Sequence, residues 1–204
     1  AWQAFRQCNY RKDFPYHYLY SNFCKNGDHI LEYGAGICPM ANALVENLGD
    51  NHDISFTFVE VDSEHYEFAK WRLKKKAPNT KMNFITANHE NPTPSVEGPF
   101  NFVCIMDVLE HLPNPYNVMK NITKNCADDA ILVETWRTDP DGPGYSDLQE
   151  AEDEREDTLA FIEENYTLIK DHGFMRIHRK LSKQEKKNKS IEVENKNSFN
   201  EIKF

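Results

Sequence analysis

The sequence lacks a hydrophobic run that could span a membrane or serve as a signal peptide. No window approaches the roughly 18 uninterrupted apolar residues of a membrane span. The N-terminal segment AWQAFRQCNYRKDF carries charged residues where a signal peptide needs its apolar stretch. We therefore expect a cytoplasmic protein without membrane contact. The 204 residues, 39% of them hydrophobic, suffice for one medium domain with its own core.

The cysteine and histidine patterns of metal sites are also lacking. The five cysteines are odd in number and none are spaced as C-x-x-C, which argues against a disulfide framework and a structural zinc site. The histidines do not cluster at ligand spacing, and no obvious trio of carboxylates marks a divalent-cation site. We expect reduced thiols and no metal.

Positive charge is scarce. Lys and Arg number 24 against 33 Asp and Glu, and the net charge is −9. A chain this acidic is repelled by phosphate backbones, so we expect no nucleic-acid partner. A small molecule is the kind of substrate that this charge favours, and the chain is expected to be a monomer or a homodimer.

Short apolar segments alternate with helical segments along the chain. This alternation predicts right-handed βαβ units and therefore an α/β fold: a three-layer sandwich around a mostly parallel, doubly wound sheet of about six or seven strands. Residues 91–99 are too rich in Pro and Gly for a helix, so that crossover is expected to be a loop. Strands are expected at 29–33, 54–61, 82–87, 100–108, 130–136 and 174–181, with a weak one at 190–193; helices are expected at 39–49, 63–77, 116–126 and 150–173.

Three regions follow from these patterns. Residues 1–26 are rich in aromatic side chains at helical spacing and are expected to form a helical cap. Residues 27–181 hold the alternating elements and form the main domain. Residues 182–204 are a polar tail rich in Lys and Asn, expected to be disordered apart from the weak strand.

The first candidate site segment is Glu32-Tyr33-Gly34-Ala35-Gly36, directly after a strand. Two glycines let the backbone turn tightly and approach a ligand, and the helix that follows presents backbone N–H groups. An ordinary strand-to-helix turn is the alternative. A dinucleotide-binding turn would have a third glycine where this chain has Pro39, whose ring would hinder contact with a pyrophosphate.

The second candidate is Asp62, at the end of the next strand and 26 residues beyond Gly36. A carboxylate there can accept hydrogen bonds from both hydroxyls of a ribose. Glu60 lies two residues earlier on the same strand face and competes for this role. The neighbouring Ser63 is a candidate N-cap of the helix that follows.

The third candidate is the segment Asp107-Val108-Leu109-Glu110-His111, after the fourth strand. Asp107 would lie at the rim of the sheet, where ligands of open parallel sheets bind. Glu110 and His111 follow one turn later, and either could act as a general base or belong to a capping and packing cluster.

Together these segments resemble the class I S-adenosylmethionine-dependent methyltransferases, which have the Rossmann-like methyltransferase fold. ILEYGAG is similar to the family's first motif, and VEVDSEHYEFAKWRL to its second strand and helix. FITANHENP, FNFVCIMDVLEHLPNP and HGFMRI are similar to later motifs, in the same order. The resemblance covers roughly residues 28–181 and implies a methyltransferase that uses S-adenosylmethionine and releases S-adenosylhomocysteine.

The resemblance also implies roles for single residues. It gives Gly34, Ala35 and Gly36 to the methionine part of the cofactor, and Asp62 with Ser63 to the ribose. Further along, Asp107 and Val108 would face the cofactor's amino group, Asn88 and His89 would lie beside the adenine, and Glu32 would hold the first turn in shape. Two positions depart from the pattern: Cys38 replaces a frequent glycine, and Asn88 replaces the usual acid near the adenine.

The acceptor side is expected to combine the N-terminal aromatic segment with the insertion after the fifth strand. A base is needed only when the acceptor must lose a proton, and His111 and His17 are the candidate catalytic residues. A non-catalytic cofactor-binding module and a nicotinamide-dependent oxidoreductase are the alternatives. The residues expected around the acceptor are Tyr16, His17 and Tyr20 on one side, and Trp136, Arg137 and Tyr145 on the other, with Gly142 and Gly144 as hinges.

Overall fold

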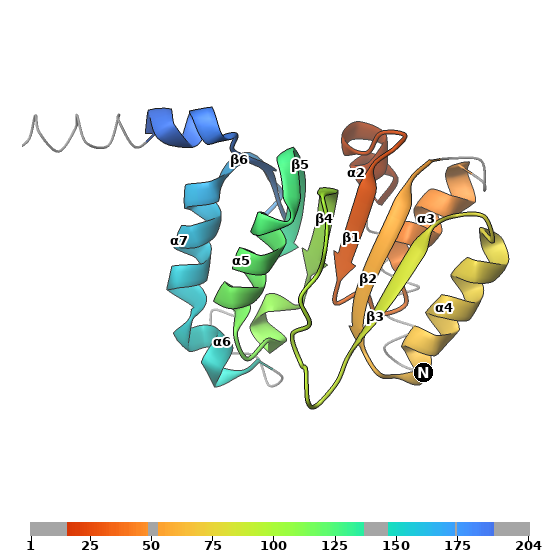
Figure 1. Cartoon of the computed structure of the whole chain (residues 1–204). Helices are drawn as coiled ribbons and strands as arrows, with labels where there is room; N and C mark the ends of the chain where they lie inside the picture. Colours follow the sequence, from red (N-terminus) through yellow and green to blue (C-terminus); the bar gives the residue numbers. More distant parts are fainter. Residues whose placement is uncertain (1–15, 49–52, 137–146, 174, 190–204) are drawn as a thin grey trace, which may run out of the picture.

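A computed structural model describes residues 16–48, 53–136, 147–173 and 175–189, without the side chain of His17. Its centre is a seven-stranded sheet (Figure 1). The strands are β1 (His29–Tyr33), β2 (Ser55–Val61), β3 (Met82–Ala87), β4 (Phe100–Met106), β5 (Cys126–Thr135), β6 (Tyr166–Asp171) and β7 (Arg176–Lys180). The helices are α2 (Tyr16–Phe23), α3 (Pro39–Leu48), α4 (Glu64–Lys76), α5 (Pro115–Lys124), α6 (Gln149–Asp153) and α7 (Arg155–Asn165), with a short 3₁₀ helix η1 (Leu109–His111).

The strand order is β3-β2-β1-β4-β5-β7-β6. The first five strands in this order are parallel, and β7 is antiparallel to both of its neighbours. The chain builds outward from β1 in one direction and from β4 in the other, so the order reverses between these two strands. In open α/β sheets a ligand binds outside the carboxyl ends of the strands at this reversal. That edge is the lower one in Figure 1, where the arrowheads of β1, β2 and β4 lie.

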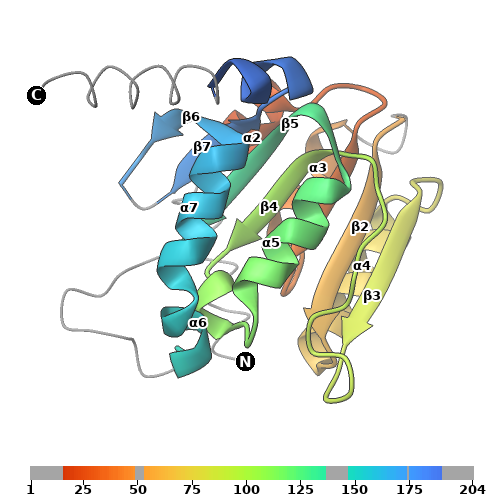
Figure 2. The ribbon, with the colours of Figure 1, turned by 60° about the vertical axis from the view of Figure 1, so that its left-hand side comes forward.

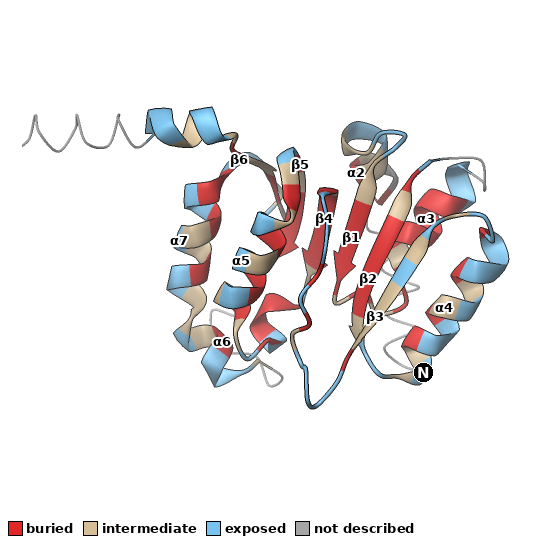
Figure 3. Cartoon of the chain, viewed as in Figure 1, coloured by how far each residue is buried: buried red, intermediate tan, exposed pale blue. Residues whose placement is uncertain are grey.

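Helices cover both faces of the sheet, as predicted for a three-layer α/β fold (Figure 2). On one face, α2, α3 and α4 pack through residues such as Leu19, Leu44 and Tyr66. On the other, α5, α6 and α7 pack through residues such as Met119 and Ile162. Because β1 and β4 are covered on both sides, nearly all their residues are buried (Figure 3). The central strands are thus a rigid support for the loops at their ends.

The helix boundaries follow from local signals in the sequence. Pro39 and Pro115 stand in the first turns of α3 and α5, where a missing N–H costs nothing. Ser63 is the N-cap of α4, because its side chain accepts a hydrogen bond from Tyr66 N–H at 3.2 Å. This confirms the cap predicted for Ser63.

The single long helix predicted over residues 150–173 is wrong. The structure has α6, then α7, and then the strand β6 from Tyr166 to Asp171. The segment Tyr166–Asp171 holds an aromatic residue, Thr167 and Ile169, residue types that favour an extended edge strand. The strand predicted at 174–181 is β7, which lies between β5 and β6 in the sheet.

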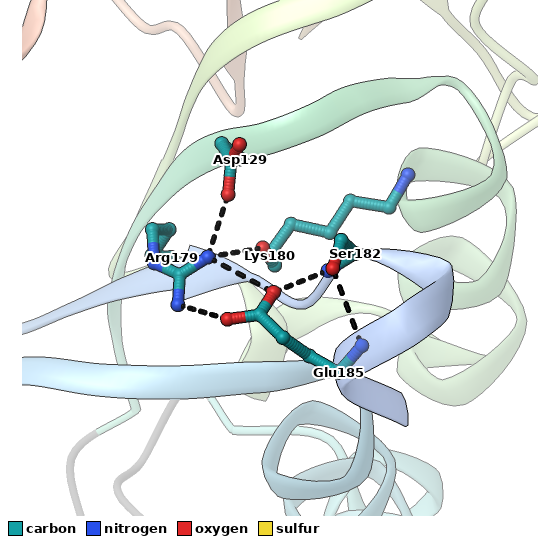
Figure 4. Close-up of polar contacts among 5 residues, drawn as sticks. All are labelled: Asp129, Arg179, Lys180, Ser182 and Glu185. Carbon is teal, nitrogen blue, oxygen red and sulfur yellow. Dashed lines mark hydrogen bonds and ion pairs between the residues drawn. The ribbon is translucent and has the colours of Figure 1, made fainter. Parts of the chain in front are cut away.

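Part of the C-terminal tail is also ordered, contrary to the expected disorder. Residues 183–189 are helical. The helix starts with a capping box: Glu185 N–H donates to Ser182 Oγ at 3.3 Å, and Ser182 N–H donates to Glu185 Oε2 at 2.8 Å (Figure 4). The Ser-x-x-Glu spacing is a capping-box signal in the sequence, but the polar composition of the tail led us to expect disorder instead. The weak strand predicted at 190–193 lies outside the described residues.

Arg179 of β7 connects this helix to the sheet. The guanidinium of Arg179 forms two hydrogen bonds with the carboxylate of Glu185 and one of 2.6 Å with Asp129 (Figure 4). The C-terminal helix therefore lies at the amino edge of β5, opposite the edge where a ligand would bind. No helix in the described part of the chain is long and apolar enough to cross a bilayer.

Candidate functional site

The three candidate segments meet at the carboxyl edge of the sheet. The glycine turn follows β1, the acidic segment follows β2, and the segment from Asp107 follows β4. Since β1 lies between β2 and β4, the turn after β1 has the other two segments on either side. Sequence order alone had suggested this meeting, and the strand pairing places the segments next to one another.

The glycine turn requires glycine for a reason that can be measured. Gly34 has a φ of +71°, and a Cβ added there would lie 2.1 Å from Val108 Cγ2. Gly36 also has a positive φ, of +53°. The absence of a side chain at Gly34 therefore lets the turn after β1 pack against Val108, in the segment after β4.

The amides of the turn are mostly used inside the protein. Gly34 and Ala35 N–H donate to the carbonyl of Val59 at 2.8 and 2.9 Å, and Cys38 N–H donates to Ala35 O at 2.6 Å. Gly36 N–H donates to a carboxylate, Glu60 Oε2, at 2.5 Å. A phosphate-binding turn needs such amides for the ligand. The arrangement therefore disfavours a pyrophosphate and with it the nicotinamide-dependent alternative.

Glu32 stabilises the start of α3. Its side chain is 3% exposed, and Oε1 accepts a hydrogen bond of 2.6 Å from Ala41 N–H. Burial raises the pKa of Glu32 to about 8, while the Ala41 hydrogen bond and the nearby Arg72 act in the opposite direction. Glu32 thus joins the end of β1 to the first turn of α3.

Glu60 is the carboxylate in contact with the glycine turn. Besides Gly36 N–H, it accepts a hydrogen bond of 2.8 Å from Val61 N–H. Asp62 is exposed, and its backbone N–H pairs with Ala87 O at 3.3 Å, while the Ser63 side chain caps α4. Of the two acids weighed from the sequence, Glu60 lies at the turn and Asp62 lies further out.

Asn88 and His89 follow β3 at the same edge and are both exposed. Asn88 Oδ1 accepts hydrogen bonds from Glu90 N–H at 3.0 Å and from Asn91 N–H at 2.9 Å. The side-chain oxygen is therefore occupied in a local turn, and only the amide NH₂ of Asn88 is left to reach a ligand.

Asp107 has an unusual backbone for a residue with a side chain, with φ of +53°. Its N–H donates to Thr135 Oγ1 at 2.6 Å, and its Oδ1 accepts from the same hydroxyl at 3.0 Å. Non-glycine residues in this conformation are held by their surroundings and concentrate at functional sites. Thr135, at the end of β5, was not singled out from the sequence.

The segment after Asp107 carries the remaining ionisable groups. His111 lies on η1 with a side chain that is 40% exposed, and its Nδ1 lies 3.7 Å from Asp147 Oδ1. Glu110 beside it is buried, and burial raises its pKa to about 7, opposed by its own backbone N–H and by His111. The structure therefore places the carboxylate of Asp147 near His111, a contact that no spacing in the sequence indicates.

The acceptor-side residues are described only in part. Trp136 follows β5 and is buried, and the guanidinium of Arg155 lies 5.3 Å from the centre of its ring. On the other side, Tyr16 is buried in the core between α2 and α3. Figure 1 shows α2 beside the start of β1, away from the glycine turn. The side chain of His17, and Arg137, Gly142, Gly144 and Tyr145, lie outside the described residues.

Among the described residues, no group of three or more His, Cys, Asp and Glu side chains is placed to hold a metal ion. The sequence pattern favoured Asp62 over Glu60 and gave no indication of Asp147 or Thr135. The alternation of side chains along β2 was the signal for Glu60. Nothing in the sequence pairs Asp147 with His111, because the contact depends on how residues 147–153 return to η1.

A family model described as "Methyltransferase domain" matches residues 2–180. Among solved structures, magnesium protoporphyrin IX methyltransferase from Synechocystis PCC 6803, with bound S-adenosylhomocysteine, has 13% identity and a TM-score of 0.60, covering 87% of this chain and 84% of its own. A putative rRNA-methylase from Clostridium thermocellum has 12% identity and a TM-score of 0.60, covering 82% and 93%. The pyocyanin biosynthetic protein PhzM has 11% identity and a TM-score of 0.58, covering 84% and 61%. No curated protein shows a significant sequence match.

Proposed function

The chain belongs to the class I S-adenosylmethionine-dependent methyltransferases, and we propose that it methylates a small-molecule acceptor by direct displacement. When bound, S-adenosylmethionine supplies an electrophilic methyl group on a sulfonium. The protein contributes binding, alignment and proton transfer. The observation that carries the proposal is the meeting of the glycine turn, Glu60 and the Asp107 segment at the reversal of strand order.

We propose Glu60 as the principal carboxylate for the ribose, with Asp62 and Ser63 next to it. Glu60 is half-buried and fixed by two backbone N–H groups, so its oxygens keep lone pairs for hydroxyl donors. Gly34, Ala35 and Gly36 would line the methionine part, and Asp107 with Val108 would close it from β4. Asn88 and His89 are proposed for the adenine, Asn88 through its amide NH₂.

The polar groups at the turn fit S-adenosylmethionine because an acceptor carboxylate is present and most backbone amides are already paired. A nucleoside with hydroxyl groups needs acceptor oxygens, and Glu60 supplies them. A phosphate needs amides, which here already have partners. The residues present therefore fit a nucleoside sulfonium better than a dinucleotide.

A small acceptor is favoured by charge. The chain carries a net charge of −9, and carboxylates line the carboxyl edge at Asp107, Glu110 and Asp147. Such an edge repels the phosphates of RNA or DNA. Two of the similar structures are named for small molecules, magnesium protoporphyrin IX and pyocyanin, and one is a putative rRNA-methylase.

We propose His111 as the general base where the acceptor must lose a proton. The carboxylate of Asp147 near Nδ1 would orient the ring and leave Nε2 for the acceptor. His17, the other base expected from the sequence, lies on α2 beside the start of β1 and away from the glycine turn (Figure 1), so we do not propose it as the base. The base role predicts that His111→Asn lowers kcat by about 10²-fold or more while the affinity for S-adenosylhomocysteine stays within about twofold.

Labelled methyl transfer tests the acceptor class directly. The protein is incubated with tritiated S-adenosylmethionine and with small-molecule, protein and RNA fractions of one cell extract. The proposal expects label in the small-molecule fraction, and none with Glu60→Gln at a cofactor concentration that saturates only the wild type. Label found only in the RNA or protein fraction would contradict a small-molecule acceptor, although it would still show methyltransferase activity.

A further inference from the structure

Three buried glutamates stand out in the described part of the chain, and one of them differs from the others. Glu32 accepts a hydrogen bond from Ala41 N–H, and Glu134 is held by Arg176 and His178. The third, Glu110, is 5% exposed, and its Oε2 has no hydrogen-bond partner. A carboxylate oxygen that is buried without a donor loses its hydrogen bonds to water and gains none in return. Such an acceptor, which no described residue satisfies, is a candidate contact for a donor on a ligand.

The charges around Glu110 indicate what that donor is. The charged groups that act on it are His111, Asp107 and Asp147, so two of the three are carboxylates. His111 is itself paired with Asp147 at 3.7 Å. No lysine or arginine figures among these groups in the described residues. A cation would therefore complete this cluster, whereas an anion would be repelled by it.

The position of Glu110 places it beside the site instead of deep in the core. It lies on η1, which begins three residues after the end of β4, at the carboxyl edge. Its backbone carbonyl accepts a hydrogen bond of 2.9 Å from Leu148 N–H, which fixes η1 to the start of α6. The side chain is thus held on a rigid support next to Asp107 and Val108.

A second buried polar atom at the same edge also has no partner in the described part of the chain. The indole Nε1 of Trp136, which follows β5, makes no hydrogen bond to a described residue, and Trp136 is 6% exposed. Trp136 and Glu110 follow adjacent parallel strands, and Thr135 and Asp107 bridge those strand ends by hydrogen bonds. A buried donor and a buried acceptor, neither paired with a described residue, therefore lie at the edge where the substrate of the proposed reaction would approach.

We propose that Glu110 recognises the acceptor through an amine, so that the small-molecule substrate is a primary or secondary amine. The carboxylate binds the ammonium or amino N–H at Oε2, and the surrounding Asp107 and Asp147 strengthen the attraction. An alcohol would offer one neutral donor and gain less, and a carboxylic acid would be repelled. This inference rests on the proposed function and names the substrate class for that site.

The pKa of Glu110 gives the proposal a pH signature. Burial raises this pKa to about 7, so near neutral pH the free protein holds the group partly protonated. An ammonium favours the ionised form, so binding an amine releases a proton. Amine affinity is therefore expected to fall at least fivefold between pH 8 and pH 6, a change that a purely structural Glu110 would not produce.

Binding to a matched set of probes tests the proposal without requiring turnover. Calorimetry and ligand-observed NMR compare 2-phenylethylamine, 2-phenylethanol and phenylacetic acid, all with S-adenosylhomocysteine bound. A series of alkylamines with their alcohols tests other sizes. We expect the amines to bind at least tenfold more tightly than the matching alcohols. Glu110→Gln should lose at least tenfold in amine affinity, because it keeps the shape and removes the charge.

Glu150→Gln is the matched control, since Glu150 is an exposed carboxylate on α6 and its removal changes the net charge equally. It should keep amine affinity within twofold. Equal binding of alcohols and amines, unchanged affinity in Glu110→Gln, or no amine binding at millimolar concentration overturns the proposal. If Glu110→Gln does not fold, the pH dependence of the wild type decides. Retained S-adenosylhomocysteine binding shows that the proposed function stands even where amine recognition fails.

Discussion

The polar side chains at the amino edge of the sheet differ in their hydrogen bonding from those at the carboxyl edge. At the amino edge, Arg179, Asp129, Glu185 and Ser182 form a closed set of ion pairs and hydrogen bonds (Figure 4). At the carboxyl edge, Glu110 Oε2 and Trp136 Nε1 are buried and have no hydrogen-bond partner among the described residues. The described polar groups of the amino edge thus satisfy one another, whereas two at the carboxyl edge do not.

The backbone shows the same difference at the turn after β1. Gly34, Gly36 and Cys38 all have positive φ within five residues, and Asp107 faces them from β4 with φ of +53°. Gly173, in the β6–β7 connection, also has a positive φ, but a Cβ there would meet nothing within 4 Å. A positive φ alone therefore does not mark the site, since Asp129 at the amino edge has one of +62°. The turn after β1 differs in the close approach of Gly34 to Val108.

Gly34→Ala should have the largest effect. The added Cβ would meet Val108 Cγ2 at 2.1 Å, in a conformation that already disfavours alanine. We expect a loss of about 2–5 kcal/mol in the free energy of unfolding and no measurable S-adenosylhomocysteine binding. Gly173→Ala is the control, with φ of +78° and open space, and should cost about 1–2 kcal/mol with binding retained. Equal losses in the two variants, measured by urea unfolding, would contradict the account.

Glu60→Gln and Asp62→Asn separate the two acids after β2. Glu60 contacts the glycine turn and Asp62 does not, so Glu60→Gln should weaken S-adenosylhomocysteine binding about 10- to 100-fold. Asp62→Asn should weaken it by about fivefold or less. Calorimetry at one pH and salt concentration compares them. A larger loss of affinity in Asp62→Asn than in Glu60→Gln would assign ribose binding to Asp62 instead.

Glu32→Gln should change how stability depends on pH. The folded-state pKa of Glu32 is raised to about 8, above its unfolded value near 4.5, so its stabilising contribution is full below pH 4.5 and is lost as pH rises toward 8. The amide can still accept the Ala41 hydrogen bond and has no charge to bury. Between pH 5 and pH 8 the wild type should therefore lose on the order of 1–3 kcal/mol relative to Glu32→Gln. Parallel pH curves from denaturant unfolding would refute this.

The smallest effect is expected at the amino edge. Arg179 holds the pKa of Glu185 at about 2, below its usual value of 4.5. The ion pair between these residues, which attaches the C-terminal helix to β7, is therefore lost as pH falls from about 4.5 toward 2. Amide hydrogen exchange in residues 183–189, corrected for intrinsic rates, should speed up over that range. Glu185→Gln should show the faster exchange already at pH 7, with S-adenosylhomocysteine binding unchanged. If the amides of this variant exchange as slowly as those of the wild type, the ion pair between Arg179 and Glu185 does not stabilise the helix.

Much of the fold followed from the sequence because its signals are local. The apolar runs of β1, β2, β3 and β4, the proline starts of α3 and α5, and the Ser63 cap each depend on a few neighbouring residues. Tyr166–Asp171 was misjudged because an acidic, helical pattern precedes it and its pairing with β7 is a tertiary contact. The C-terminal helix carried a local signal, Ser182-x-x-Glu185, outweighed by the polar composition around it.

The site was predictable in outline only. Motif order identified the glycine turn and the Asp107 segment, because these depend on residue type at strand ends. Two features lay beyond the sequence: the bond between Glu60 and Gly36, and the contact between His111 and Asp147. Both join residues from different elements, and the direction of a side chain is set by packing that no spacing records.

Calorimetric titration of the whole chain with S-adenosylhomocysteine, beside the reduced nicotinamide cofactors, tests the central claim most directly. The account predicts micromolar binding of S-adenosylhomocysteine that weakens at least tenfold in Glu60→Gln, and no binding of a dinucleotide. Binding of a dinucleotide, or S-adenosylhomocysteine affinity that is indifferent to Glu60, would contradict the site described here.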